Sequence, residues 1–133
     1  MDAKMFCFQC QETAKGTGCT VQGVCGKKSD LSAMMDMLLF AVRGIGVLTT
    51  GLRRAGKETE REVDHLVVDA LFSTITNANF DEAAIADAIE QTLRMKEEMM
   101  KDVADASKLP AAALWNGARS EFQEKAASAD VGV

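Results

Sequence analysis

The chain has 133 residues, of which 47% are hydrophobic and 26% charged, as is typical of one globular domain with a buried core. The net charge of −5 argues against a nucleic-acid binder, because such proteins carry a strongly basic face. A single proline leaves long stretches free to be helical, and an aromatic content of 5% without tyrosine argues against an aromatic-rich β-sandwich.

Residues 1–28 form a distinct first segment, which holds all four cysteines. Four glycines in or beside the cysteine run predict an irregular, turn-rich conformation. Four lysines against two acidic residues give the segment a net charge of +2, so the rest of the chain must carry −7. Lysines close to metal-bound thiolates would offset part of their negative charge.

Helical periodicity begins at Ser29–Asp30, which we expect to cap a first helix running to about Ala55 and stopping at Gly56. Gly44 and Gly46 either weaken this helix or permit close packing. Apolar residues recur along it at spacings of three and four, and the expected buried face consists of Leu31, Met34, Met35, Met37, Leu38, Ala41, Val42, Ile45 and Leu48.

Neither a membrane span nor a secretory signal is expected from the sequence. The stretch 34–42 contains Asp36 and precedes Arg43, so it is too short and too polar to cross a bilayer. Residues 1–12 lack the apolar run that a secretory signal needs. We therefore expect a cytoplasmic protein, and cysteines in a reducing compartment indicate metal binding rather than disulfides.

Two further long helices are predicted. One covers 58–76, with a buried stripe of Val63, Val67, Ala70, Leu71 and Ile75. The next begins with Asn79 as N-cap and Glu82 three residues later, a capping-box pattern, and its apolar side consists of Ile85, Ala88, Ile89, Leu93, Lys96 and Met100.

A loop is expected around 110–117, anchored by Trp115, and a short helix over 120–128 closes the chain. The fold class is therefore all-α: a three-helix bundle preceded by an irregular cysteine-bearing loop. We expect residues 1–28 and the bundle 29–133 to form one domain together.

The strongest chemical motif is Cys7-x2-Cys10-x8-Cys19-x5-Cys25. A single turn can aim the first two sulfurs at one metal centre, and the other two must return from a loop shaped by the glycines. The spacing favours an iron–sulfur cluster over zinc, because zinc ribbons usually have two short cysteine pairs, and disulfides or unrelated thiols remain the weakest alternative. It matches neither common ferredoxin spacing, so the residues alone predict a four-thiolate site without choosing the cluster type.

Other chemically capable residues have simpler explanations. His65 is the single histidine and is expected to have a surface or packing role. The methionines at helical spacing fit core packing or a contact face better than metal binding.

The segment from Met5 to Lys27, MFCFQCQETAKGTGCTVQGVCGK, closely resembles the N-terminus of the hybrid cluster proteins, also called prismane proteins or hydroxylamine reductases. The resemblance includes all four cysteines with their spacing. A second stretch, Leu71 to Asp81 (LFSTITNANFD), and the helix after it also look like this family.

The resemblance implies that Cys7, Cys10, Cys19 and Cys25 bind a [4Fe–4S] cluster, since family members with longer cysteine spacing carry [2Fe–2S]. Family members are several times longer, and later cysteines, a histidine and glutamates hold their hybrid cluster. This chain has no cysteine after Cys25, so the reductase site is absent from it. The chain is then a fragment of the enzyme or a free-standing domain.

Two hypotheses follow. In the first, the chain is the electron-transfer domain of a hydroxylamine reductase, with the remaining domains and an electron donor protein as partners. In the second, it is a zinc- or cluster-stabilised helical docking module, whose methionine-rich apolar face could drive self-association into a homo-oligomer. Hydroxylamine reduction by this chain alone is a weaker third reading.

Overall fold

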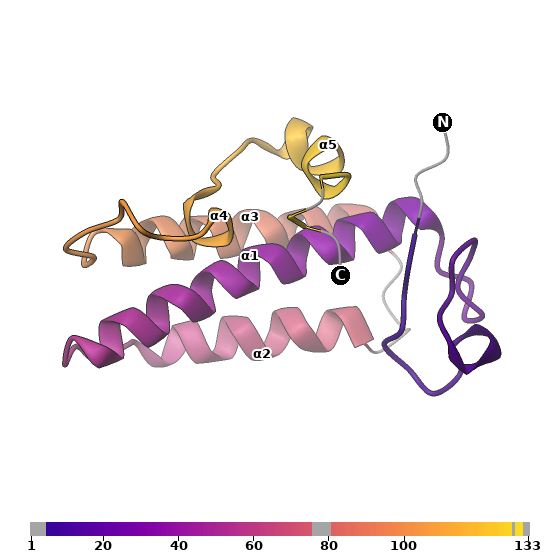
Figure 1. The fold of residues 1–133 in the computed structure, drawn as a ribbon, viewed down its shortest axis with the longest axis horizontal. Coiled ribbons are helices and arrows are strands. Elements are labelled where there is room, and N and C mark those ends of the chain that lie inside the picture. The colour runs from indigo at the N-terminus through magenta and orange to yellow at the C-terminus, as the bar shows by residue number, and fades with distance from the viewer. Residues whose placement is uncertain (1–4, 76–80, 129, 132–133) are drawn as a thin grey trace.

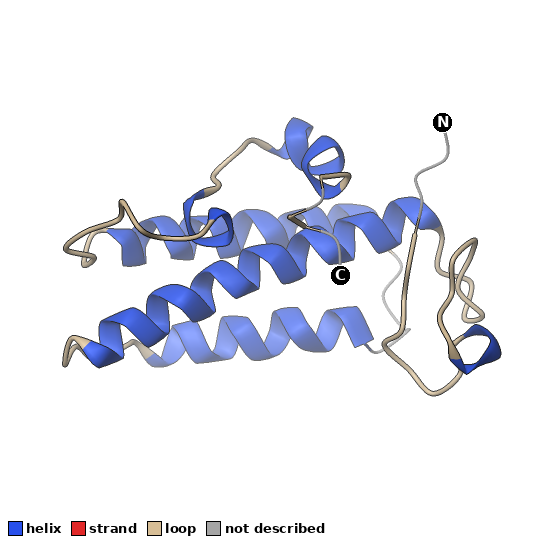
Figure 2. Cartoon of the chain, in the orientation of Figure 1, coloured by secondary structure: helices blue, strands red, loops and turns tan. Residues whose placement is uncertain are grey.

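The computed structural model describes residues 5–75, 81–128 and 130–131, and shows three long helices lying side by side (Figure 1). These are α1 (Ser29–Arg54), α2 (Arg61–Ile75) and α3 (Glu82–Met100). The short elements are the 3-10 helices η1 (Ala14–Gly16) and η2 (Arg119–Glu121) and the helices α4 (Ala111–Leu114) and α5 (Phe122–Ala126). Figure 2 shows no strand among the described residues, and the predicted all-α bundle with an irregular N-terminal segment is confirmed.

Helix α1 is the central element and contacts α2, α3, α4 and α5. Because neighbours surround it, its apolar surface is wider than one stripe. All nine residues predicted for its buried face are buried, and Phe40 and Leu52 join them. The three methionines at 34, 35 and 37 therefore belong to the core and do not form the exposed face proposed for self-association.

By length and composition, α1 is also the one described helix that could cross a membrane. The complete helix is longer than the apolar stretch 34–42, on which the expectation of no membrane span rests. In the bundle, 67% of its most apolar window is buried. The apolar character of α1 is thus used for packing against the other helices.

The two ends of α1 differ in their capping. Lys28 is the N-cap residue and its side chain makes no capping bond, so the predicted Ser29–Asp30 cap is wrong. At the other end Gly56 adopts a positive φ of +80. The Gly56 N–H donates a hydrogen bond to Arg53 O at 3.0 Å, and the Lys57 N–H donates one to Leu52 O at 2.9 Å. This pair of bonds is a Schellman motif, and it confirms the predicted stop.

Helix α2 starts at Arg61, three residues later than predicted, and packs on α1 through Val63, Val67 and Ala70. Leu71 was wrongly assigned to the buried stripe, because the next inward position belongs to Thr74. The side chain of Ile75 and residue 76 lie outside what the structure describes.

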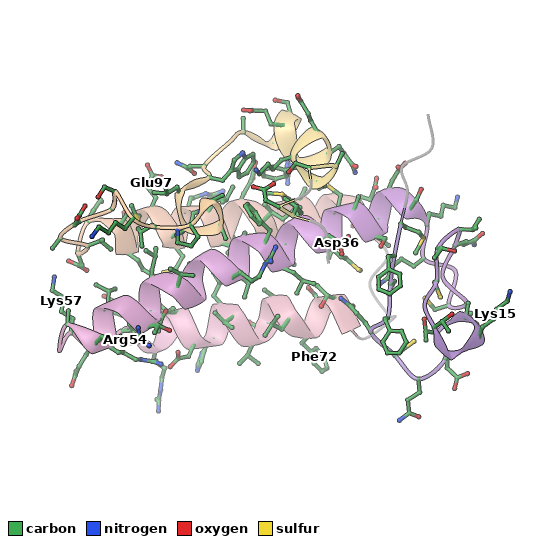
Figure 3. All side chains as sticks on the ribbon, in the orientation of Figure 1. Lys15, Asp36, Arg54, Lys57, Phe72 and Glu97 are labelled. Atoms are coloured by element: carbon green, nitrogen blue, oxygen red, sulfur yellow. The ribbon has the colours of Figure 1, made fainter. Side chains whose placement is uncertain are left out.

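The outward side of α2 exposes large apolar side chains. Val68 and Leu71 are exposed, and 62% of the Phe72 surface is accessible. Figure 3 shows Phe72 pointing away from the bundle.

Helix α3 begins at Glu82, with Asp81 as its N-cap: the Asp81 carboxylate accepts a hydrogen bond from Ala83 N–H at 2.9 Å. The predicted cap, Asn79, lies outside the described residues. The buried face of α3 is close to the prediction and consists of Ile85, Ala86, Ile89, Thr92, Leu93, Lys96 and Met99.

The C-terminal residues cover one side of the bundle. Helix α4 lies inside the region predicted as a loop, and α5 occupies the centre of the predicted final helix. Trp115 packs partly buried on the core, with its ring centroid 6.1 Å from that of Phe122.

Lys96 fixes this C-terminal cover to α3. Only 2% of Lys96 is exposed, and its ammonium donates hydrogen bonds to the carbonyls of Ala112, at 3.2 Å, and Trp115. Burial lowers the pKa of Lys96 to about 8. Beneath this contact, Gly44 of α1 lies so close to Ala112 O that a Cβ on residue 44 would overlap it.

Asp36 is a half-buried acidic residue of α1. It lies on α1 near the end that carries the cysteine segment (Figure 3). Burial raises the pKa of the Asp36 carboxyl to about 6, and the positive charges of Lys27 and Arg43 oppose that rise only partly.

The two glycines of α1 offer a matched test of the close approach to α4. Gly44→Ala should lower the free energy of unfolding by about 1–3 kcal/mol, because the new methyl overlaps a backbone carbonyl. Gly46→Ala should instead raise it, by up to about 1 kcal/mol, since nothing lies within 4 Å of that position. Urea titrations measure both values, and equal effects would contradict the packing described here.

The raised pKa of Asp36 predicts a pH dependence of stability. Between about pH 4 and 6 the folded chain binds this proton more tightly than the unfolded chain, so Asp36 lowers stability as pH rises. Asp36→Asn should therefore gain stability relative to the wild type as pH increases from 4 to 7. Urea titrations across this pH range measure the free energies of unfolding, with the exposed Asp69→Asn as control. A difference between Asp36→Asn and the wild type that does not vary with pH would contradict the prediction.

Candidate metal centre

Cys7 and Cys19 are brought together by a short antiparallel pairing of the backbone. The Cys7 N–H donates to Cys19 O at 3.0 Å, and the Cys19 N–H donates to Cys7 O at 2.9 Å. Residues directly opposite each other in such a pair place their side chains on the same face. The two sulfurs therefore leave the backbone on one side of the segment.

The chain between these cysteines turns through η1. Gly16 N–H bonds Thr13 O at 3.0 Å and Gly18 N–H bonds Ala14 O at 3.2 Å, which closes the turn beyond Cys10. Gly18 has φ +140, and the Phe6 ring occupies the place of any Cβ, so only glycine fits there.

A second tight turn carries Cys25. The Gly23 N–H donates to Lys27 O at 2.7 Å, and the Gly26 N–H donates to Gly23 O at 2.9 Å. Cys25 is exposed, Cys7 and Cys10 are half-buried, and Cys19 is buried. The turn leads directly into α1, so the helix holds this end of the segment.

Hydrogen-bond donors surround the Cys19 sulfur. The Ala14 N–H donates to Cys19 Sγ at 3.4 Å, and the Thr13 hydroxyl lies 3.6 Å from the same sulfur. The backbone of Ala14, then that of Val24 and the Thr13 hydroxyl, lower the pKa of the Cys19 thiol. These contacts favour the thiolate, which is the form that binds metals.

A lysine lies beside the Cys7 sulfur. The Lys27 ammonium is 3.6 Å from Cys7 Sγ, and only 3% of the Lys27 surface is exposed. Of the lysines that we expected to offset thiolate charge, Lys15 and Lys28 are exposed, and Figure 3 shows Lys15 at the outer edge of the segment.

All four cysteines are free thiols and lie in one segment at one end of the bundle (Figure 1). Among the described residues, no three cysteine, histidine or acidic side chains converge closely enough to hold a single metal ion. The donor set nevertheless suits a group that prefers sulfur ligands, since four thiols are present and N–H groups point at sulfur. His65 is exposed and lines a groove between α2 and α3, which none of the cysteines lines.

The sequence did not indicate the roles of Thr13 and Ala14 at the Cys19 sulfur. No pattern in the residue order shows that the hydroxyl and the N–H would point there, because their direction depends on the turn through η1. The burial of Lys27 was also unforeseen, although its charge was noted.

The chain is similar to curated proteins along nearly its whole length. A "Hydroxylamine reductase" of Bacteroides thetaiotaomicron is 53% identical over 127 residues, which is 96% of this chain and 23% of that protein. A "Hydroxylamine reductase" of Desulfovibrio desulfuricans is 44% identical over 127 residues, again 96% of this chain and 22% of that protein. The chain thus spans about a quarter of the length of these relatives.

The family model described as "Prismane/CO dehydrogenase family" matches residues 5–131. That range includes all four cysteines and all three long helices. The chain belongs to the Prismane/CO dehydrogenase family.

Proposed function

We propose that Cys7, Cys10, Cys19 and Cys25 bind one [4Fe–4S] cluster, and that the chain is the electron-transfer domain of a hydroxylamine-reductase-like enzyme. The observation that carries this proposal is the paired backbone of Cys7 and Cys19 with donors directed at both sulfurs. A zinc ion or a [2Fe–2S] cluster is the alternative occupant. Membership of the prismane family favours iron–sulfur binding over zinc.

A bound cluster of this kind supplies a one-electron centre. The residues of the chain hold the four thiolates and stabilise their negative charge. Ala14 and Thr13 do so at Cys19, and Lys27 does so at Cys7. Hydrogen bonds and charges at the sulfurs are among the factors that set the potential of such a centre.

The place of this chain within a larger enzyme is inferred from the length of its relatives. Since this chain spans 23% of the first relative, we propose that other domains of the parent enzyme carry the hybrid cluster and receive the electrons. An electron donor protein would approach near the exposed Cys25. Residues 1–28 and 29–133 act as one domain in this proposal, in the reducing cytoplasm that keeps thiols free.

Anaerobic purification followed by iron and sulfide assays tests the proposal. We expect a brown protein with about four irons and four sulfides per chain. Cys19→Ala should lose most of this iron, because the buried thiolate with the most donors is removed, whereas Thr20→Ala at the exposed neighbour should keep it. A colourless wild-type protein with one bound zinc would sink the proposal, and two irons with two sulfides would correct the cluster type.

The apolar outer side of α2 favours a second function, in which the domain docks onto other proteins or onto itself. Val68, Leu71 and Phe72 are exposed there. In the isolated chain, this face should drive self-association as the concentration rises.

Light scattering over a wide concentration range measures this association. Phe72→Ser should weaken it, because an exposed aromatic ring is removed from α2. Leu114→Ser removes an exposed apolar side chain from α4 and should leave it unchanged. A strictly monomeric wild-type chain would count against a docking role for this face.

A further inference from the structure

The burial of Lys27 is unusual for a charged side chain. Only 3% of its surface is exposed, although an ammonium group loses strong hydration when it is buried. Such a burial persists when the charge is compensated by hydrogen bonds or opposite charge. The Lys27 ammonium has Cys7 Sγ at 3.6 Å, and its charge also acts on the Asp36 carboxyl.

The backbone fixes where this side chain starts. Lys27 O accepts the Gly23 N–H at 2.7 Å, which ties it into the turn that carries Cys25. Lys27 Cβ lies 3.0 Å from the place that a Cβ on Gly23 would take, so the turn and the lysine pack without spare room. Lys28, the next residue, is already the N-cap of α1. Lys27 is thus held between a cluster-bearing turn and the central helix.

A small, mostly apolar cavity lies beside the contact between Lys27 and Cys7, with Phe6, Phe8 and Met35 in its lining. Its volume is about 70 Å³, and Gln9, Ser32 and Asp36 are among the residues that line it. Gln9 Oε1 is buried there with no hydrogen-bond partner in the described part of the chain. The ammonium thus faces the Cys7 sulfur in a largely apolar setting, with the Asp36 carboxyl as the acidic group in the cavity lining.

We propose that Lys27 is a positioning residue for the cluster, whose buried ammonium holds the Cys7 thiolate and stabilises the one-electron reduced form. This inference rests on the proposed function. Reduction adds one electron, delivered by the donor protein, and the cluster with its thiolates becomes more negative by one charge. A fixed positive charge on the Cys7 side favours that form without any proton transfer, and burial keeps the attraction from being screened.

Position distinguishes Lys27 from the other lysines of the segment. Lys15 is exposed, so water and salt screen its charge. If net charge alone mattered, any of these lysines would have the same effect. The buried contact predicts that, of these lysines, Lys27 has the largest effect on the reduction potential of the cluster.

The test compares the wild-type chain with Lys27→Met, Lys27→Arg and the control Lys15→Met, each reconstituted anaerobically with iron and sulfide. The measurements are iron and sulfide content and the midpoint potential from a redox titration followed by electron paramagnetic resonance. In Lys27→Met the ratio of reduced to oxidised cluster at a fixed potential should fall about tenfold, a shift of about 59 mV to more negative values for one electron. Lys27→Arg and Lys15→Met should stay close to the wild type.

Retention of the cluster provides a second measurement. If Lys27→Met holds no cluster while Lys27→Arg does, the positive charge is required for binding, which also supports the proposal. The proposal is overturned if Lys27→Met keeps the wild-type potential, if Lys15→Met shifts it equally, or if Lys27→Arg behaves like Lys27→Met. A wild-type chain that takes up no iron and sulfide contradicts the proposed function instead, so the two failures are distinguishable.

Discussion

The packing of α1 is the constraint on which the rest of the structure depends. This helix contacts the two other long helices and two short ones, and its buried surface extends from Leu31 to Leu52. Its first residues follow directly on the turn that holds Cys25 and Lys27, so the core of the bundle and the cysteine segment share one rigid element. Gly44 shows how tightly the same helix is covered on another side, by Ala112 of α4.

Two buried lysines lie beside this helix, one at the C-terminal cover and one at the cysteine segment. Lys96 is buried at the C-terminal cover, where two backbone carbonyls compensate its charge. Lys27 is buried at the cysteine segment, where a sulfur and the Asp36 carboxyl lie near it. In both cases a long aliphatic stem packs in an apolar region and the ammonium finds acceptors at the edge of it. Lys96 connects the C-terminal cover to α3 through these carbonyls, and we assign Lys27 to the cluster.

The long helices could be predicted because apolar spacing over many residues is a strong signal, and all nine residues expected on the buried face of α1 are buried. The sequence predictions failed where contacts with neighbouring residues decide which side chains are buried or where a helix begins. Leu71 fits the helical stripe as well as Thr74 does, but the position of α1 selects Thr74. The first turn predicted for α2 is not helical, and Thr59 there accepts a hydrogen bond from the Arg53 side chain at 3.1 Å. For the candidate site, residue order indicated the four thiols but not their donors, since those depend on turn geometry.

The cysteine segment has a small apolar interior: of its large side chains, Met5 is buried while Phe6, Phe8, Val21 and Val24 are exposed. Its described backbone is held mainly by turn bonds and by the two bonds between Cys7 and Cys19. Little burial therefore opposes the conformational entropy that this segment loses on ordering. A ligand that joins four points along it would bind the ordered form alone, and by mass action would supply much of its order. With the proposed cluster as that ligand, cofactor loading and the ordering of this end of the domain would be a single coupled equilibrium, controlled by the supply of iron and sulfide.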